Sequence, residues 1–128
     1  MAKNNIKILL VEDDVFLLNM YAEKFRRESF DVFVADNGIK ALKVANDELP
    51  AIILLDLILP KMDGFEVLRE LKKNPALVNV PVILLTNLSQ KDDINRGMEL
   101  GAVDFLIKAH FMPSEVVNKV KKILAEQT

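Results

Sequence analysis

The chain has 128 residues, of which 51% are hydrophobic and 28% charged, and its formal net charge is −2. This composition is typical of one soluble globular domain and shows no basic footprint for nucleic acid. The lack of cysteine excludes disulfides and thiolate metal sites, and no apolar run approaches the roughly 20 residues of a membrane span, so we expect a cytoplasmic protein with no membrane partner.

The first half of the chain alternates short apolar runs with amphipathic segments. Residues 6–11 predict a strand, and residues 30–35 predict a second strand near an edge of the sheet. Between them, Asp14 is placed to cap a helix whose apolar residues share one face: Leu17, Met20, Tyr21 and Phe25. A second helix begins at Asn37-Gly38 and ends before Pro50. Its spacing points three residues inward: Ile39, Leu42 and Ala45.

The second half continues the same alternation. Residues 51–56, 80–86 and 102–107 predict three more strands. One helix between them begins at Gly64, ends at Asn74-Pro75 and points Phe65, Leu68 and Leu71 toward the core. Another helix runs from about residue 90 to 100, and Gly101 is its expected left-handed cap. Pro113 opens a last helix with an apolar stripe of Val116, Val117, Val120, Ile123 and Leu124.

Five strands alternating with five helices indicate an α/β fold. Parallel crossovers place helices on both faces of one sheet, and four of the strands are nearly all apolar, as burial on both sides requires. No repeat, linker or low-complexity segment divides the chain, so we expect a single domain over residues 1–128.

Chemically active residues follow four of the predicted strands. Glu12-Asp13, Asp56, Thr86 and Lys108 should converge, because parallel strands put their carboxyl ends on one edge. Three carboxylates so close need a compensating cation, and an all-oxygen site with open water positions suits Mg²⁺. Asp13 is the better direct ligand, while Glu12 can act through water. Asp56 could bind the metal and also present its other oxygen as a nucleophile.

Each of these residues has a simpler interpretation when taken alone. Asp56 could cap the following turn, Thr86 could be a turn residue, and Lys108 could be a solvated strand end. Together, a metal, a lysine and a hydroxyl around a carboxylate favour a phosphoryl-transfer site in which aspartyl-phosphate forms.

Four segments resemble the receiver domain of response regulators: 8–14 (ILLVEDD), 54–64 (LLDLILPKMDG), 82–86 (VILLT) and 101–108 (GAVDFLIK). The resemblance covers essentially the whole chain. It implies a flavodoxin-like (βα)5 doubly wound sheet with strand order 2-1-3-4-5 in a three-layer α/β/α arrangement.

The resemblance also implies roles for single residues. Asp56 is the phosphoacceptor, and the Mg²⁺ ligands are Glu12, Asp13, Asp56 and the backbone carbonyl of Ile58. Thr86 and Phe105 are the switch pair, Lys108 pairs with the phosphate, and Ile58 and Leu88 flank the approach of water.

By the same resemblance the protein is a phosphorylation-dependent switch of a two-component system rather than an ordinary enzyme. A histidine kinase or phosphotransfer protein supplies the phosphoryl group from phosphohistidine, and the switch assists its own phosphorylation and dephosphorylation. With no output domain after the last helix, it would act on a separate partner through the face of the fourth helix, fifth strand and fifth helix, which includes Arg96, Phe105, Lys119 and Lys122.

The chain departs from the family pattern at three positions. Ala109 replaces the usual proline after Lys108, so we expect a trans bond there. Asn87 replaces a small residue, and Phe105 replaces a common tyrosine. The single histidine, His110, is expected to be a solvent-facing loop residue.

Of three rival functions, the residues leave the adaptor conceivable and disfavour the phosphatase and the flavin carrier. An adaptor that has lost the chemistry is conceivable because of Ala109 and Asn87. An aspartate-dependent phosphatase would need a second carboxylate where Ile58 stands. A flavin carrier would need a Gly/Ser/Thr-rich loop after the first strand, which the chain lacks.

Overall fold

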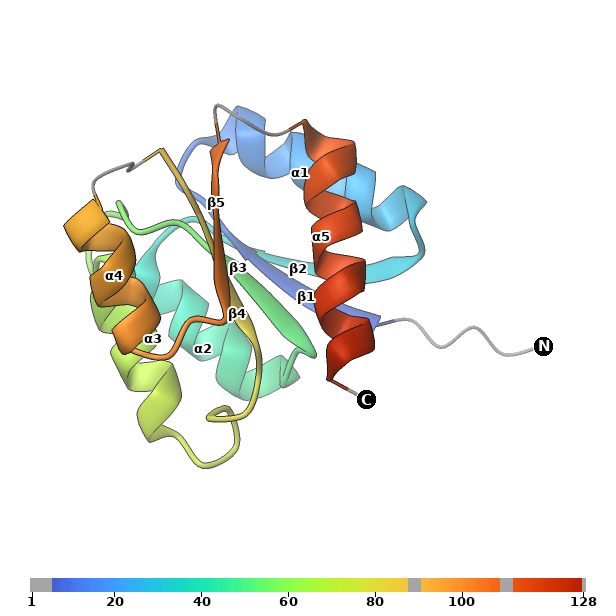
Figure 1. Cartoon of the computed structure of the whole chain (residues 1–128). Helices are drawn as coiled ribbons and strands as arrows, with labels where there is room; N and C mark the ends of the chain where they lie inside the picture. Colours follow the sequence, from blue (N-terminus) through green and yellow to red (C-terminus); the bar gives the residue numbers. More distant parts are fainter. Residues whose placement is uncertain (1–5, 88–90, 109–111, 128) are drawn as a thin grey trace.

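The computed structural model describes residues 6–87, 91–108 and 112–127 of the chain (Figure 1). Its strands are β1 (Ile6–Val11), β2 (Phe30–Ala35), β3 (Ile52–Leu55), β4 (Val82–Thr86) and β5 (Asp104–Ile107). Its helices are α1 (Val15–Arg27), α2 (Gly38–Glu48), α3 (Gly64–Lys73), α4 (Lys91–Glu99) and α5 (Pro113–Glu126). Among these helices, none combines the length and the hydropathy needed to cross a membrane.

All five strands are parallel and lie in the order β2-β1-β3-β4-β5. This order confirms the arrangement that the family resemblance implied, with β2 at one edge. Val11 pairs with Leu55, and Leu55 pairs with Leu84, so the carboxyl ends of the three central strands are nearly level. The residues that follow these ends are therefore neighbours.

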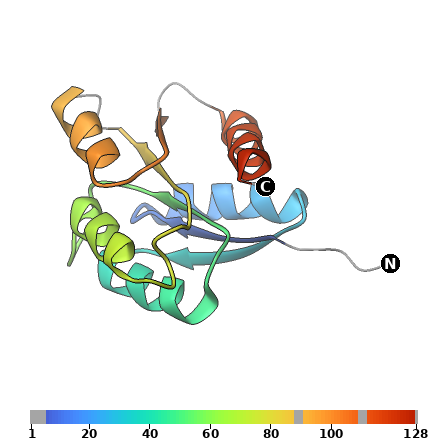
Figure 2. The same ribbon diagram turned by 60° about the horizontal axis from the view of Figure 1, so that its bottom comes forward.

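The sheet is covered on both faces, as Figures 1 and 2 show. Alternate strand residues point to opposite sides, so two apolar cores form. One core packs α1 and α5 against Ile8, Leu10, Ile52, Leu54 and Ile83. The other packs α2 and α3 against Leu9, Ile53, Leu55 and Leu84. The predicted three-layer arrangement is confirmed.

Side-chain caps begin three of the helices. Asp14 accepts a hydrogen bond from the Leu17 amide at 3.1 Å, as predicted. Asn37 caps α2 through the Lys40 amide at 2.9 Å, and Asp63 caps α3 through the Glu66 amide. These caps fix where each helix leaves the loop that follows its strand.

The structure corrects one predicted helix face and shortens several elements. Ile39 was expected inward but is 55% exposed, because Gly38, Ala41 and Ala45 form the buried face of α2. Three strands begin later than predicted, β3 at residue 52, β4 at 82 and β5 at 104. Gly101 does take a positive φ, of 116°.

Candidate functional site

Four strand ends meet at the carboxyl edge of the sheet. Glu12 follows β1, Asp56 follows β3, Thr86 ends β4 and Lys108 follows β5. Glu12 and Asp56 are 5% exposed, and Thr86 is fully buried. Together with the exposed Asp13 they line one hollow, so the predicted convergence of these residues is present in the structure.

Lys108 lies at the centre of this cluster. Its Nζ donates to Oδ2 of Asp56 at 2.7 Å and also to Oε1 of Glu12. The side chains of all three residues are less than a tenth exposed. One ammonium group therefore bridges two buried carboxylates whose strands are neighbours in the sheet.

Backbone amides hold the remaining carboxylate oxygens. Oε2 of Glu12 accepts from the Asp14 amide at 3.0 Å, and Oδ1 of Asp56 accepts from the Ile58 amide at 3.2 Å. The amide of Asp56 in turn donates to the carbonyl of Val11, which ties the residue to the end of β1. Both carboxylates are thus fixed in place, as a preorganised site requires.

Burial and pairing act against each other on the charges of the site. Burial raises the pKa of Glu12 above its usual value, although the hydrogen bond from Lys108 lowers it in part. Burial alone would lower the pKa of Lys108, but its hydrogen bonds to Asp56 and Glu12 outweigh this effect and raise it. The lysine is therefore held in its charged form.

The donor set fits a hard divalent cation. Carboxylate oxygens of Glu12, Asp13 and Asp56 lie within 4.8 Å of one another, and Asp13 is exposed at the mouth of the hollow. These three side chains offer oxygen donors, and the hollow beside them has room for water, which is the coordination that Mg²⁺ prefers.

Gly64 lets the loop after β3 fold back against the acceptor strand. Its amide donates to the carbonyl of Leu57 at 2.9 Å. A Cβ at this position would lie 2.4 Å from the Asp56 carbonyl oxygen, so a larger residue would displace the loop. The sequence places Gly64 at the start of a helix but does not reveal this contact.

The other predicted site residues are placed as follows. Phe105 in β5 is half-buried and packs against the core beneath α2 and α3. Ile58 is 58% exposed and lines the hollow with Asn87. Leu88, Ala109 and His110 lie outside the described residues, as does the predicted trans bond after Lys108.

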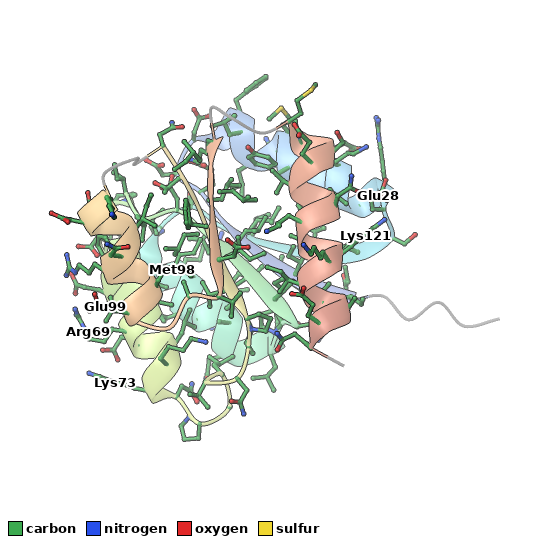
Figure 3. All side chains as sticks on the ribbon, viewed as in Figure 1. Glu28, Arg69, Lys73, Met98, Glu99 and Lys121 are labelled. Carbon is green, nitrogen blue, oxygen red and sulfur yellow. The ribbon has the colours of Figure 1, made fainter. Side chains whose placement is uncertain are left out.

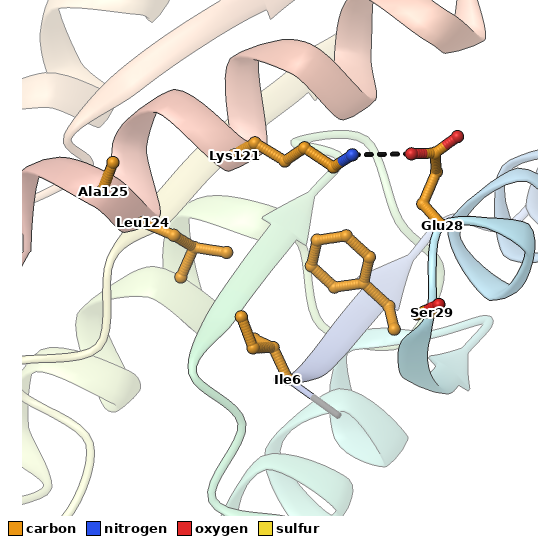
Figure 4. A pocket seen from close by; sticks show the side chains of 7 residues that line it. Ile6, Glu28, Ser29, Lys121, Leu124 and Ala125 are labelled. Atoms are coloured by element: carbon orange, nitrogen blue, oxygen red, sulfur yellow. Dashed lines mark hydrogen bonds and ion pairs between the residues drawn. The ribbon is translucent and has the colours of Figure 1, made fainter. Parts of the chain in front are cut away.

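A second hollow lies at the opposite, amino end of the strands (Figure 4). It is lined mainly by apolar groups, including Ile6, Phe30 and Leu124. An ion pair of 2.6 Å between Lys121 and Glu28 stands at its side. Its lining offers no group of carboxylates for phosphoryl chemistry, so the acidic hollow is the candidate site.

Comparisons with known proteins agree with this geometry. The family model described as the response regulator receiver domain matches residues 8–121. The alkaline phosphatase synthesis transcriptional regulatory protein PhoP of Bacillus subtilis is 39% identical over 120 residues, which cover 94% of this chain and 49% of PhoP. The chain spans about half the length of the curated relatives it matches.

Solved structures show the same fold. The BeF3-activated N-terminal receiver domain of Klebsiella pneumoniae RstA is 30% identical, with a TM-score of 0.84 over 92% of this chain and 97% of that one. A CheY-like receiver domain protein from Methanospirillum hungatei is 25% identical, with a TM-score of 0.90 over 97% of both chains.

Proposed function

The chain belongs to the response regulator receiver domain family, and we propose that it is a phosphorylation-dependent signalling switch with Asp56 as its phosphoacceptor. One observation carries the assignment of the acceptor. Asp56 follows β3, the middle strand of the sheet, so its buried carboxylate lies between the acidic pair after β1 and Thr86 at the end of β4, and it accepts a hydrogen bond from Lys108.

The proposed reaction is an in-line transfer from phosphohistidine. An oxygen of Asp56 attacks phosphorus, the P–N bond breaks, and the imidazole leaves with the electron pair and takes up a proton. Lys108, which now donates to Asp56, can donate to a phosphoryl oxygen instead. Mg²⁺, when held by Glu12, Asp13, Asp56 and the Ile58 carbonyl, supplies positive charge for the phosphoryl oxygens.

The response to phosphorylation is proposed to start at Thr86. Its side chain lies at the end of β4, fully buried beside the site. A phosphoryl group draws the hydroxyl inward, and the ring of Phe105 on the neighbouring strand moves into the space that this shift opens. The inactive and active conformations are then two populations whose balance the phosphoryl group changes.

The proposed partners are of two kinds. A histidine kinase or phosphotransfer protein supplies the phosphoryl group, and a downstream protein binds the face formed by α4, β5 and α5. On that face Lys119 forms an ion pair of 2.7 Å with Asp104, whereas Lys122 is exposed. The supporting feature is the mixture of basic and apolar groups that these three elements present.

The switch is distinguished from an adaptor without chemistry by direct phosphorylation. With acetyl phosphate and Mg²⁺, we expect mass spectrometry to find one acid-stable, base-labile phosphoryl group on the parent and none on Asp56→Asn. Asp36→Asn is the matched control, because Asp36 follows β2 as Asp56 follows β3 but is exposed. A phosphoryl group on Asp56→Asn would refute the assignment, and an unmodified parent would favour the adaptor.

A further inference from the structure

Helix α4 is attached to the rest of the molecule in an unusual way. Of its residues only Gly97 is buried, and Met98 is 36% exposed. A Cβ on Gly97 would lie 2.3 Å from the Leu84 side chain, so the backbone of α4 packs on that side chain of β4. The helix therefore contributes almost no apolar side chain to the core, and other contacts must hold it.

Those contacts come from α3, which lies beside α4 in both views (Figures 1 and 2). The guanidinium carbon of Arg96 lies 4.1 Å from the ring centre of Phe65 in α3. Figure 3 shows Arg69 and Lys73 of α3 near Glu99 of α4, at the outer edge of the two helices. The stacked pair therefore joins α4 to α3 through an exposed arginine and a buried ring.

A second contact fixes the carboxyl end of α4. Gly101 lies over the stem of Lys72, whose carbon atoms would be 3.1–3.3 Å from an added Cβ. The Lys72 ammonium donates to the carbonyls of Val78 and Val80 at 3.1 and 2.9 Å. Lys72 is thus anchored to backbone carbonyls that lie away from the acidic hollow, whereas the Arg96 contact reaches the residue next to Gly64.

Phe65 is in a position to respond to that site. It directly follows Gly64, whose backbone packs against Asp56 and Leu57. Phe65 is 7% exposed and packs in the core beneath α3. The backbone that packs against the acceptor residue and the ring on which Arg96 is stacked therefore belong to adjacent residues.

We propose that the stack of Arg96 on Phe65 is a latch that couples the phosphorylation site to α4. When the latch is closed, Arg96 is held on the ring and α4 stays on β4. When phosphorylation shifts the acceptor loop, the stack opens, α4 loosens, and the exposed Arg96 guanidinium leaves the ring and can pair with an acidic group of a partner. The latch rests on the proposed function, because it transmits the phosphorylation of Asp56.

Amide hydrogen exchange tests the latch first without any phosphodonor. A cation–ring contact that involves an exposed cation stabilises the closed position of α4 by an amount that corresponds to roughly two- to fivefold in an opening equilibrium. We therefore expect amides of residues 95–101 to exchange about that much faster in Arg96→Met. Arg96→Lys should behave similarly, because lysine keeps the charge but has no planar group to stack.

Two further variants show whether the contact itself is responsible. Glu99→Gln, an exposed change on the same helix, should leave exchange unchanged. Phe65→Leu should speed exchange, and adding Arg96→Met to it should cause no further change if the two residues act as one contact. Exchange in Arg96→Met equal to that of the parent, or fully additive effects, would overturn the latch.

Phosphorylation supplies the second part of the test. With acetyl phosphate and Mg²⁺, the parent should show faster α4 exchange, whereas Arg96→Met should change less than about twofold because its latch is already open. Mass spectrometry of the same samples separates the two hypotheses. A phosphorylated parent with unchanged α4 exchange refutes the latch alone, and an unphosphorylated parent refutes the proposed function.

Discussion

Replacing Lys108 by methionine tests whether its ammonium holds two buried carboxylates together. Lys108 donates to both Glu12 and Asp56, and all three side chains are buried. Methionine keeps most of the stem volume but removes the charge. The variant is therefore left with two carboxylates facing each other in a poorly solvated hollow.

The size of the effect follows from these contacts. A hydrogen bond to a charged group contributes about 1.5–3 kcal/mol, and removal of one partner of a buried ion pair costs about 3–5 kcal/mol. The variant also avoids the cost of burying the ammonium, so we expect a net loss of about 3 kcal/mol in the free energy of unfolding at pH 7.5. For a domain of this size that loss lowers the melting temperature by about 10–15 °C.

The loss should depend on pH in a definite direction. Burial raises the pKa of Glu12, and Lys108 opposes this rise, so the variant should raise that pKa further. A carboxyl group whose pKa is higher in the folded than in the unfolded protein contributes its full stability at pH values below the unfolded-state pKa, here 4.5. That stability is lost as the pH rises through the folded-state pKa. The difference between variant and parent should therefore be smaller at pH 5 than at pH 7.5.

Urea denaturation at the two pH values, with and without Mg²⁺, measures this. Mg²⁺ should stabilise the variant more than the parent, because it brings positive charge to the same carboxylates. Lys72→Met is the matched control, since Lys72 is also partly buried but donates only to backbone carbonyls. Its loss should not change between pH 5 and 7.5 or with Mg²⁺. A Lys108→Met protein as stable as the parent at pH 7.5 would refute the reasoning.

Three further predictions concern the same site. Mg²⁺ at ten times its dissociation constant should stabilise the folded state by about 1.4 kcal/mol, which is measured as a higher melting temperature. An undiminished stabilisation in Asp13→Ala would contradict the proposed set of Mg²⁺ ligands. Thr86→Ala should still be phosphorylated but should show a weak change in amide exchange over residues 86–110, and a full response would disprove the coupling. In the double variant Ile58→Asn/Leu88→Glu, hydrolysis of the phosphoryl group should be roughly tenfold faster for each water contact of about 1.4 kcal/mol that is gained in the transition state. The measurement is the decay of phosphorylated protein after the donor is removed. Equal decay in the parent and the variant would show that these side chains do not control the water.

The sequence predicted the fold because its signals are local and repeated. Apolar runs that end on Asp56 or Thr86 have the pattern of buried parallel strands, and the structure has strands there. Parallel geometry then makes convergence of the strand ends unavoidable, which is why residues far apart in the chain could be grouped. The strand order itself came from the family resemblance, because alternation alone permits several orders.

What the sequence could not predict depends on tertiary contacts. Ile39 fits an inward helical position by spacing, but the close approach of Gly38 to the Met62 backbone turns a different face of α2 toward the sheet. The hydrogen-bond partners of Lys108 likewise could not be predicted from the sequence. A position at the end of a strand does not reveal how far a long side chain extends across neighbouring strands. Arg96 was expected on a partner-binding face, and only the structure shows it stacked on Phe65.

The charges of the site explain why its parts depend on one another. Three carboxylates and one ammonium group leave a local charge of −2 when all are ionised. A divalent cation neutralises that charge, whereas phosphorylation of Asp56 replaces one negative charge by roughly two. The phosphorylated site therefore has more negative than positive charge, even with the cation bound. This excess favours one more hydrogen-bond donor close to the phosphoryl oxygens. Thr86 is the hydroxyl that lines the hollow from the end of β4, so the electrostatic imbalance acts on the residue from which the conformational response is proposed to start.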